Sequence, residues 1–227
     1  MSYRRSDNIV PVLAIIILCF IIYIATLVVA KFFWHPGQQT TLFDFCQTAS
    51  QIYQFKSSHI DPLTFLLGLT PAGFKCMPWT IVTDLFVHGD ILHIIFNMIT
   101  LYFFGTFLIR LVGTRDFLII YFLGGIAGNL FFMLFAYFNF LTSPYSIVIG
   151  ASGAIFALGG ALAVLTPRLR VFVFPIPAPM PLWVAVIGGF VILIFVGGVA
   201  WQGHLGGLVF GLLAGLVLRR RIRTPFS

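Results

Sequence analysis

Long apolar runs without charged residues constrain this chain more than any other feature. Residues 8–30 carry no charge, and residues 91–109 contain one histidine, His93, and no Asp, Glu, Lys or Arg. Residues 117–167 and 171–218 also lack Asp, Glu, Lys and Arg, and both are too long for one span. A membrane-spanning helix needs about 20 mostly apolar residues, and only 8% of the chain is charged. The sequence therefore predicts an all-α integral membrane protein that crosses the bilayer several times.

Polar and proline-rich breaks divide the two longest runs. Residues 139–146 interrupt the first, while the proline-rich segment 175–181 and the pair Gly197-Gly198 bound a helix in the second. Six transmembrane helices are predicted, near residues 9–30, 91–110, 117–138, 147–166, 181–197 and 200–218. They form one membrane domain, 9–218, between a cytoplasmic N-terminal tail, 1–8, and a basic cytoplasmic tail, 219–227. The first run has flanks like those of a signal peptide, but it is longer than the usual apolar segment of one.

The basic residues predict the orientation of the helices. With the N-terminus inside, ten Lys and Arg residues fall in inside segments and three in the first outer loop, 31–87. Because positive charge concentrates on the cytoplasmic side, an N-in/C-in orientation is expected. The same positions indicate that the net charge of +7 reflects membrane topology and a lipid partner, and no nucleic acid is expected. The outer loop also holds Cys46 and Cys76, for which a disulfide and two free thiols both remain open.

Polar side chains inside the predicted spans point to function, because they are costly in a bilayer. They open three helices that all run inward from the outer side, so their first turns share one depth. The members are His88, His93 and Asn97 at the opening of the second helix, Gly150-Ala151-Ser152-Gly153 in the fourth helix, and His204 in the sixth. A serine becomes a good nucleophile when a neutral histidine takes its proton. Ser152 is therefore the predicted nucleophile and His204 its base.

The second helix offers donors for a developing oxyanion. His93 and Asn97 lie four residues apart on one helix face, and the backbone N–H of Ser152 adds a further donor. Gly150 and Gly153 allow groups to approach closely. All six acidic residues are Asp and none lies in a span, so a Ser–His dyad is expected and no triad. The missing Glu also excludes a His-Glu-x-x-His zinc site, and no metal or cofactor is expected.

Small residues predict how the fourth and sixth helices pack. Gly207, Gly211 and Gly215 follow His204 on one face, a spacing that lets two helix backbones come close. On the fourth helix, a matching face is formed by Ser152, Phe156, Gly159, Gly160 and Ala163. Packing these two faces is expected to bring Ser152 beside His204.

Each motif alone has a simpler explanation. A serine in Gly-x-Ser-Gly is often only a small residue at a helix contact. A lone histidine near the interface is usually hydrated, and a glycine stripe by itself indicates only packing. His88 and Asp90, near the outer surface, are equally consistent with solvated side chains. The argument for a site rests on their coincidence at one depth.

These motifs, in this order and spacing, resemble those of the rhomboid family of intramembrane serine proteases. The matching patterns are His88-x₄-His93-x₃-Asn97-Met98, Gly150-Ala151-Ser152-Gly153 and His204-x₂-Gly207-x₃-Gly211, with the approach Pro78–Thr83, Phe86 and His88 also similar. The likeness covers residues 78–215. It implies a six-helix fold, with Ser152 and His204 as catalytic residues and an oxyanion hole from His93, Asn97, Gly150 and the Ser152 backbone. It also implies supporting roles for His88, Gly153, Phe156, Gly207 and Gly211.

The resemblance further implies hydrolysis of peptide bonds in or near the transmembrane segments of single-span or polytopic membrane-protein substrates. The expected location is a prokaryotic plasma membrane, with the site opening to the outer side. Two residues depart from the family pattern: Phe156 stands where a tyrosine is common, and Thr80 follows Trp79 where an arginine is common. Neither departure removes a catalytic group.

Two other functions compete with proteolysis. A catalytically silent rhomboid-like protein that binds membrane clients would be expected to lack Ser152 or His204, and both are present. A transporter could use His88, His93 and His204 as a proton relay. The absence of any carboxylate from the predicted spans argues against coupled ion transport.

Overall fold

The fold is a bundle of apolar helices. The computed structural model describes residues 8–32, 60–173 and 176–221. Four helices in this part are long and apolar enough to cross a membrane: α1 (Val10–Phe32), α5 (Ile91–Val112), α6 (Thr114–Tyr137) and α9 (Trp201–Arg219). Two apolar helices are shorter, α7 (Ser152–Leu165) and α8 (Leu182–Ile194). The predicted all-α membrane architecture agrees with this arrangement, while six crossings and their orientation stay predictions.

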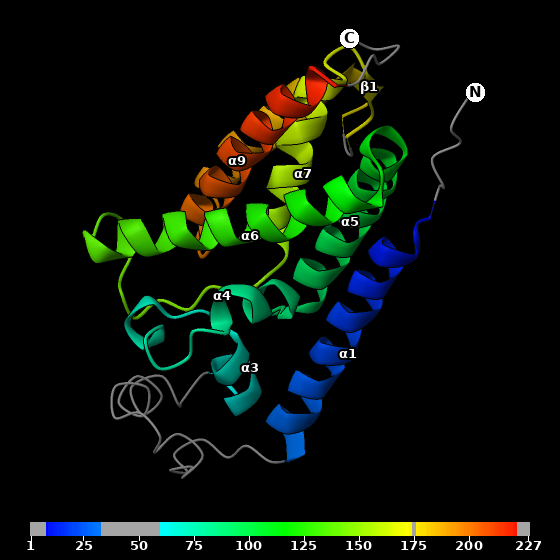
Figure 1. The fold of residues 1–227 in the computed structure, drawn as a ribbon. Helices are drawn as coiled ribbons and strands as arrows, with labels where there is room; N and C mark the ends of the chain where they lie inside the picture. Colours follow the sequence, from blue (N-terminus) through cyan, green and yellow to red (C-terminus); the bar gives the residue numbers. More distant parts are fainter. Residues whose placement is uncertain (1–7, 33–59, 174–175, 222–227) are drawn as a thin grey trace.

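Helix α7 is the centre of the bundle. Most of its residues are buried, including Ala154, Ala157, Leu158 and Ala161. It packs against α9 and α6, and to a lesser extent against α5 and α8, while α1 packs on α5 (Figure 1). A helix that is apolar on every face is expected at the core of a bundle. The residue that begins α7, Ser152, is therefore held by neighbours on several sides.

Glycines allow α7 and α9 to pack backbone against backbone. A Cβ built on Gly207 would overlap the carbonyl oxygen of Gly153, and one built on Gly211 would overlap that of Ala157. Gly128 of α6 approaches α9 as closely, because its Cβ would lie 2.6 Å from the Gly203 carbonyl oxygen. The predicted packing through Gly207 and Gly211 is thus present. The prediction for α7 was partly wrong, since Gly159 faces away from α9.

Gly159 instead contacts the α5 and α8 side of the bundle. A Cβ built on it would lie 3.0 Å from Phe104 and 3.3 Å from Val186. The surface of α7 that meets α9 contains Gly153, Ala157 and Gly160. Helical periodicity gives which residues share a face, but the rotation of that face is decided by all the helices that surround α7.

The fourth predicted helix, 147–166, begins later than expected. Residues before Ser152 are extended: the Leu69 N–H donates to the Val148 carbonyl oxygen at 3.0 Å, and the Val148 N–H donates back to Leu69 at 2.8 Å. This pairing fixes the backbone of Val148 outside a helix. Gly150 follows with a φ of +118°, a conformation that glycine adopts readily. Helix α7 can therefore start only at Ser152.

Short elements between α1 and α5 cover one end of the bundle. They are α3 (Pro62–Leu67), η2 (Pro71–Gly73), α4 (Thr80–Thr83) and η3 (Asp84–Phe86). The Trp79 indole N–H donates to the Leu66 carbonyl oxygen at 2.9 Å, and the Thr80 hydroxyl donates to Met77 at 2.6 Å. Thr80 is buried, so it braces this segment locally where an arginine was expected from the resemblance.

The remaining part of the predicted outer loop, residues 33–59, lies outside the described residues, as does Cys46. Cys76 is disulfide-bonded, whereas Cys19 is a free, buried thiol in α1. The proline-rich segment after α7 is not helical where it is described. It contains a two-stranded antiparallel ladder of β1 (Arg170–Val171) and β2 (Met180–Pro181). The division into two tails and one membrane domain stays a prediction.

Candidate active site

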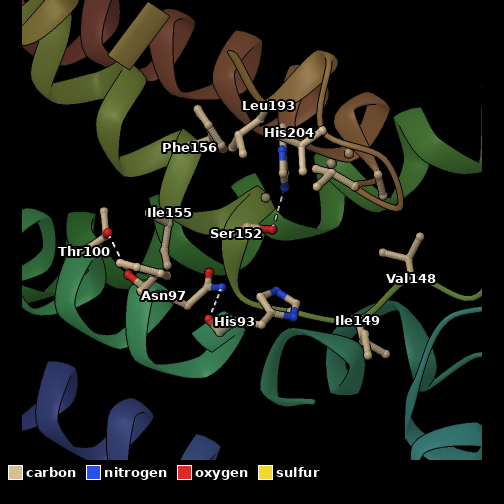
Figure 2. A pocket seen from close by; sticks show the side chains of 18 of the residues that line it. His93, Asn97, Thr100, Val148, Ile149, Ser152, Ile155, Phe156, Leu193 and His204 are labelled. Atoms are coloured by element: carbon tan, nitrogen blue, oxygen red, sulfur yellow. Dashed lines mark hydrogen bonds between the residues drawn. The ribbon is translucent and has the colours of Figure 1, made fainter. Parts of the chain in front are cut away.

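Ser152 and His204 meet at the contact between α7 and α9. Ser152 is the first residue of α7, and His204 lies in the first turn of α9. The Ser152 Oγ and the His204 Nε2 are 2.7 Å apart (Figure 2). This is hydrogen-bond distance, and a neutral imidazole with Nε2 unprotonated would accept the serine proton. The two predicted residues are thus brought together although 52 positions separate them in sequence.

The His204 ring is held by packing. It is buried, and its Nδ1 atom has no hydrogen-bond partner within the described part of the chain. The Phe156 ring lies against it, with 4.8 Å between ring centroids and 30° between the ring planes. Phe156 is itself in contact with Phe190 of α8, at 6.0 Å. An aromatic ring and close helix packing therefore orient the imidazole where a triad would use a carboxylate.

His93 and Asn97 project from α5 toward Ser152 (Figure 2). Asp90 caps this helix, since its carboxylate accepts the His93 N–H at 2.9 Å. The Asn97 side-chain amide donates to the His93 carbonyl oxygen at 2.8 Å. That amide has a second hydrogen, and Asn97 lines the same cavity as Ser152. Two polar side chains of α5 thus lie on the same side of the cavity as the serine (Figure 2).

Gly150 makes room for the His93 ring. A Cβ at this position would lie 2.7 Å from the His93 Nε2 atom, and its positive φ also favours glycine. The Gly150 N–H donates to the Asp84 carbonyl oxygen at 2.9 Å. It is therefore not free to bind an oxyanion, and the contribution of Gly150 is space for the neighbouring donor. Ser152, as the first residue of α7, has a backbone N–H that needs no intrahelical partner.

His88 lies behind His93. The two rings make an edge contact, with 5.1 Å between centroids. His88 is buried, and neither of its ring nitrogens has a hydrogen-bond partner among the residues that the structure describes. Burial, together with the neighbouring His93, lowers the pKa of His88 to about 4. His88 is therefore neutral at physiological pH and supports His93 by packing.

A cavity of about 910 Å³ lies beside Ser152 and His204. His93, Asn97, Ser152 and His204 line it together with apolar residues of α5, α7 and α8. A cavity with apolar walls and a few convergent polar groups is typical of a binding site. The described residues contain no cluster of three metal-ligating side chains. The cavity thus contains a serine hydroxyl, an imidazole within hydrogen-bond distance of it and further polar side chains, in an apolar surrounding.

Sequence reasoning missed two buried polar residues beside the site. Asp84 of η3 and Asn129 of α6 are both buried, and the Asn129 side-chain amide donates to the Asp84 carboxyl at 2.9 Å. Asn129 also lines the cavity. The available signal was its position within the long apolar run 117–167, because polar residues inside a span are functional candidates.

Comparison with known proteins places the chain in one family. The family model for the Rhomboid domain matches residues 75–221. The chain is 30% identical over 160 residues to the yeast "Rhomboid protein 1, mitochondrial", covering 63% of this chain and 42% of that protein. It is 33% identical over 157 residues to the Arabidopsis thaliana "RHOMBOID-like protein 12, mitochondrial", covering 62% and 46%.

A bacterial relative is the Bacillus subtilis "Rhomboid protease GluP", which is 33% identical over 141 residues, covering 62% of this chain and 26% of that protein. The chain thus spans less than half the length of each of these three relatives. Because two of them are mitochondrial, the expected prokaryotic plasma membrane is not supported. The match to the family model covers more than half of the sequence and includes all the site residues described above, so the chain belongs to the rhomboid family.

Proposed function

We propose that this protein is an intramembrane serine protease that hydrolyses peptide bonds in or near transmembrane segments of other membrane proteins. The observation that carries the proposal is the 2.7 Å contact between Ser152 Oγ and His204 Nε2 at the wall of a cavity among apolar helices. The relative from Bacillus subtilis is named a rhomboid protease. Single-span and polytopic membrane proteins are the proposed substrates.

The proposed chemistry needs only residues of this chain. Ser152 Oγ attacks the carbonyl carbon of the scissile bond while His204 Nε2 takes the hydroxyl proton. The resulting oxyanion is stabilised by His93, Asn97 and the Ser152 backbone N–H. His204 then gives the proton to the leaving amine as the carbon–nitrogen bond breaks. Water attacks the acyl-enzyme in the second half, with His204 as base, and restores the serine.

The membrane arrangement belongs to the same proposal. Six helices cross or enter the bilayer, with both termini on the cytoplasmic side, as the distribution of Lys and Arg favours. The first turns of α5, α7 and α9 then lie toward the outer side, and water reaches Ser152 from there. Fusing a compartment-sensitive reporter to the C-terminus tests this orientation, and a signal from the outer side contradicts it.

The central experiment measures cleavage of a single-span model substrate by purified protein in detergent and in liposomes. Wild type is expected to cleave, whereas Ser152→Ala and His204→Ala should lose activity by several orders of magnitude. Ser146→Ala, a serine substitution in the loop before α7, is the matched control and should retain activity. A fluorophosphonate should label wild type at Ser152 only.

Two outcomes would contradict the proposal. If Ser152→Ala cleaves as well as wild type, the serine is not the nucleophile. If wild type cleaves none of a panel of membrane substrates and the fluorophosphonate does not label Ser152, the chain is a client-binding member of the family. Binding of those same substrates without cleavage would then be the expected result.

A further inference from the structure

A buried polar contact joins the segment before α5 to α6. The Asp84 carboxyl is fully buried and its Oδ1 accepts the Asn129 side-chain amide at 2.9 Å. The same Asn129 amide nitrogen donates its other hydrogen to the Ile81 carbonyl oxygen, also at 2.9 Å. The η3 turn that contains Asp84 is thereby attached to the middle of α6. Removing Asp84 would leave one buried N–H of the Asn129 amide without its acceptor, and removing Asn129 would leave the buried Asp84 Oδ1 without this donor.

The same turn holds the segment that leads into Ser152. The Asp84 carbonyl oxygen accepts the Gly150 N–H at 2.9 Å. Gly150 in turn lies against the His93 ring, where a Cβ would come within 2.7 Å of Nε2. The position of Gly150 therefore determines both where the His93 ring lies and how the backbone enters α7 at Ser152. Asp84 thus acts on the proposed oxyanion donors through Gly150, without facing the substrate.

The environment of Asp84 indicates a neutral carboxyl. Burial raises the pKa of Asp84 well above its ordinary value, with the Asn129 hydrogen bond opposing the shift only in part. The second oxygen, Oδ2, has no hydrogen-bond partner among the described residues and is free to carry the proton. A neutral side chain that still accepts from Asn129 should therefore replace Asp84 with little loss.

We propose that Asp84 and Asn129 are positioning residues that hold Gly150, and with it the oxyanion donors, against the Ser152–His204 pair. This inference rests on the proposed proteolytic function. It concerns residues that neither touch the reacting atoms nor belong to the motifs of the family resemblance. The Asp84 backbone carbonyl accepts the Gly150 N–H, and the Asp84 carboxyl accepts the Asn129 amide. Asn129 thereby attaches the η3 turn to α6.

The test compares variants that remove the contact with one that keeps it. Asp84→Ala and Asn129→Leu each remove the contact, from opposite sides, while Asp84→Asn keeps a neutral acceptor of the same shape. Asp116→Ala is the matched control, because Asp116 lies in the first turn of α6, far along the helix from Asn129. Cleavage in liposomes is divided by the fraction of Ser152 that a fluorophosphonate labels, which removes the effect of misfolded protein.

For Asp84→Ala and Asn129→Leu, kcat per labelled site should fall about tenfold to hundredfold, because small misplacements of catalytic groups have effects of this size. KM should change less than about threefold, since the lost interaction acts in the transition state. The double variant should lose no more than about the larger single loss, because both changes remove one shared contact. Asp84→Asn and Asp116→Ala should stay within about threefold of wild type.

Two results would overturn the inference while leaving the proteolytic function intact. One is an unchanged kcat in Asp84→Ala and Asn129→Leu, and the other is a loss in Asp84→Asn as large as in Asp84→Ala. Failure of the proteolytic function itself would appear in wild type. In that case, amide hydrogen exchange still tests whether Asp84 and Asn129 hold the segment at Gly150. Exchange at residues 150–152 should rise in Asp84→Ala and Asn129→Leu but not in Asp84→Asn. No rise in either variant would also overturn the inference.

Discussion

Gly207→Ala should separate the two helices that carry Ser152 and His204. A Cβ at this position would overlap the Gly153 carbonyl oxygen and lie 2.8 Å from the Gly153 carbonyl carbon. Ordinary van der Waals contacts of a Cβ begin near 3.4 Å, so α7 and α9 must part locally by about 0.6 Å or more. The carbonyl oxygen and carbon of Gly153 belong to the backbone of α7, so they cannot move aside without moving the helix.

The consequence falls directly on the Ser152–His204 contact. An added separation of about 0.6 Å would stretch the 2.7 Å distance to about 3.3 Å, beyond the usual length of a hydrogen bond donated by a hydroxyl. Misplacement by about 1 Å can cost about a hundredfold in rate. We therefore expect kcat for a model transmembrane substrate to fall about tenfold to hundredfold in Gly207→Ala, with a parallel slowing of Ser152 labelling by a fluorophosphonate.

Gly188→Ala is the matched control for this substitution. Gly188 lies within α8, and a Cβ built there meets nothing within 4 Å. Exchanging glycine for alanine inside a helix in open space favours the helix by about 1 kcal/mol, so this variant should be folded and active. The reasoning is refuted if Gly207→Ala keeps the kcat and labelling rate of wild type, or if Gly188→Ala loses as much as Gly207→Ala.

Three further predictions concern side chains around the site. Phe156→Ala removes the ring packed against His204 and should lower kcat about threefold to tenfold, whereas Phe156→Tyr keeps the ring and should stay near wild type in the same cleavage assay. Because the pKa of His88 is lowered from 6.5 to about 4 in the folded protein, the unfolded state binds the proton first. The free energy of unfolding should therefore drop by roughly 3 kcal/mol as pH falls from about 6.5 to about 4, and a denaturant titration of His88→Gln should show a smaller drop. Asp84 should change the free energy of unfolding in the opposite direction. Its raised pKa gives stability that is present below pH 3.8 and lost as pH rises. Asp84→Asn should flatten this decline of stability with rising pH, and an unchanged slope would show that Asp84 is not neutral when folded.

Much of the architecture was predictable because its signals are local. Helices overlap all six predicted ranges, since apolar length and polar breaks are read from the chain itself. Two of them, α7 and α8, are shorter than a full span. For α7 the reason is non-local: the Leu69–Val148 pairing holds the backbone before Ser152 in an extended conformation, and no property of residues 147–151 alone reveals that partner.

The candidate site was predictable to the extent that depth can be read from a sequence. Ser152 and His204 each fall in the first turn of a helix with the same predicted direction, so their proximity followed from topology and glycine spacing. The buried contacts of Asp84 beside the site could not be predicted in this way. Asp84 is in a short turn outside every predicted span, and its bonds to Asn129 and Gly150 join residues far apart in the chain.

The sequence by itself thus determined the membrane class, the order of the helices and the residues that can carry chemistry, because these depend on composition and on helical period. Only the tertiary structure decided that α7 starts at Ser152, that Gly153 and Ala157 face α9 while Gly159 does not, and that the Gly150 N–H is bonded to Asp84. The physical reason is that helix rotation and the conformation of an extended segment are set by simultaneous packing and hydrogen bonding with several distant elements. A periodic pattern in one segment shows which of its residues share a face, but not which distant element that face contacts.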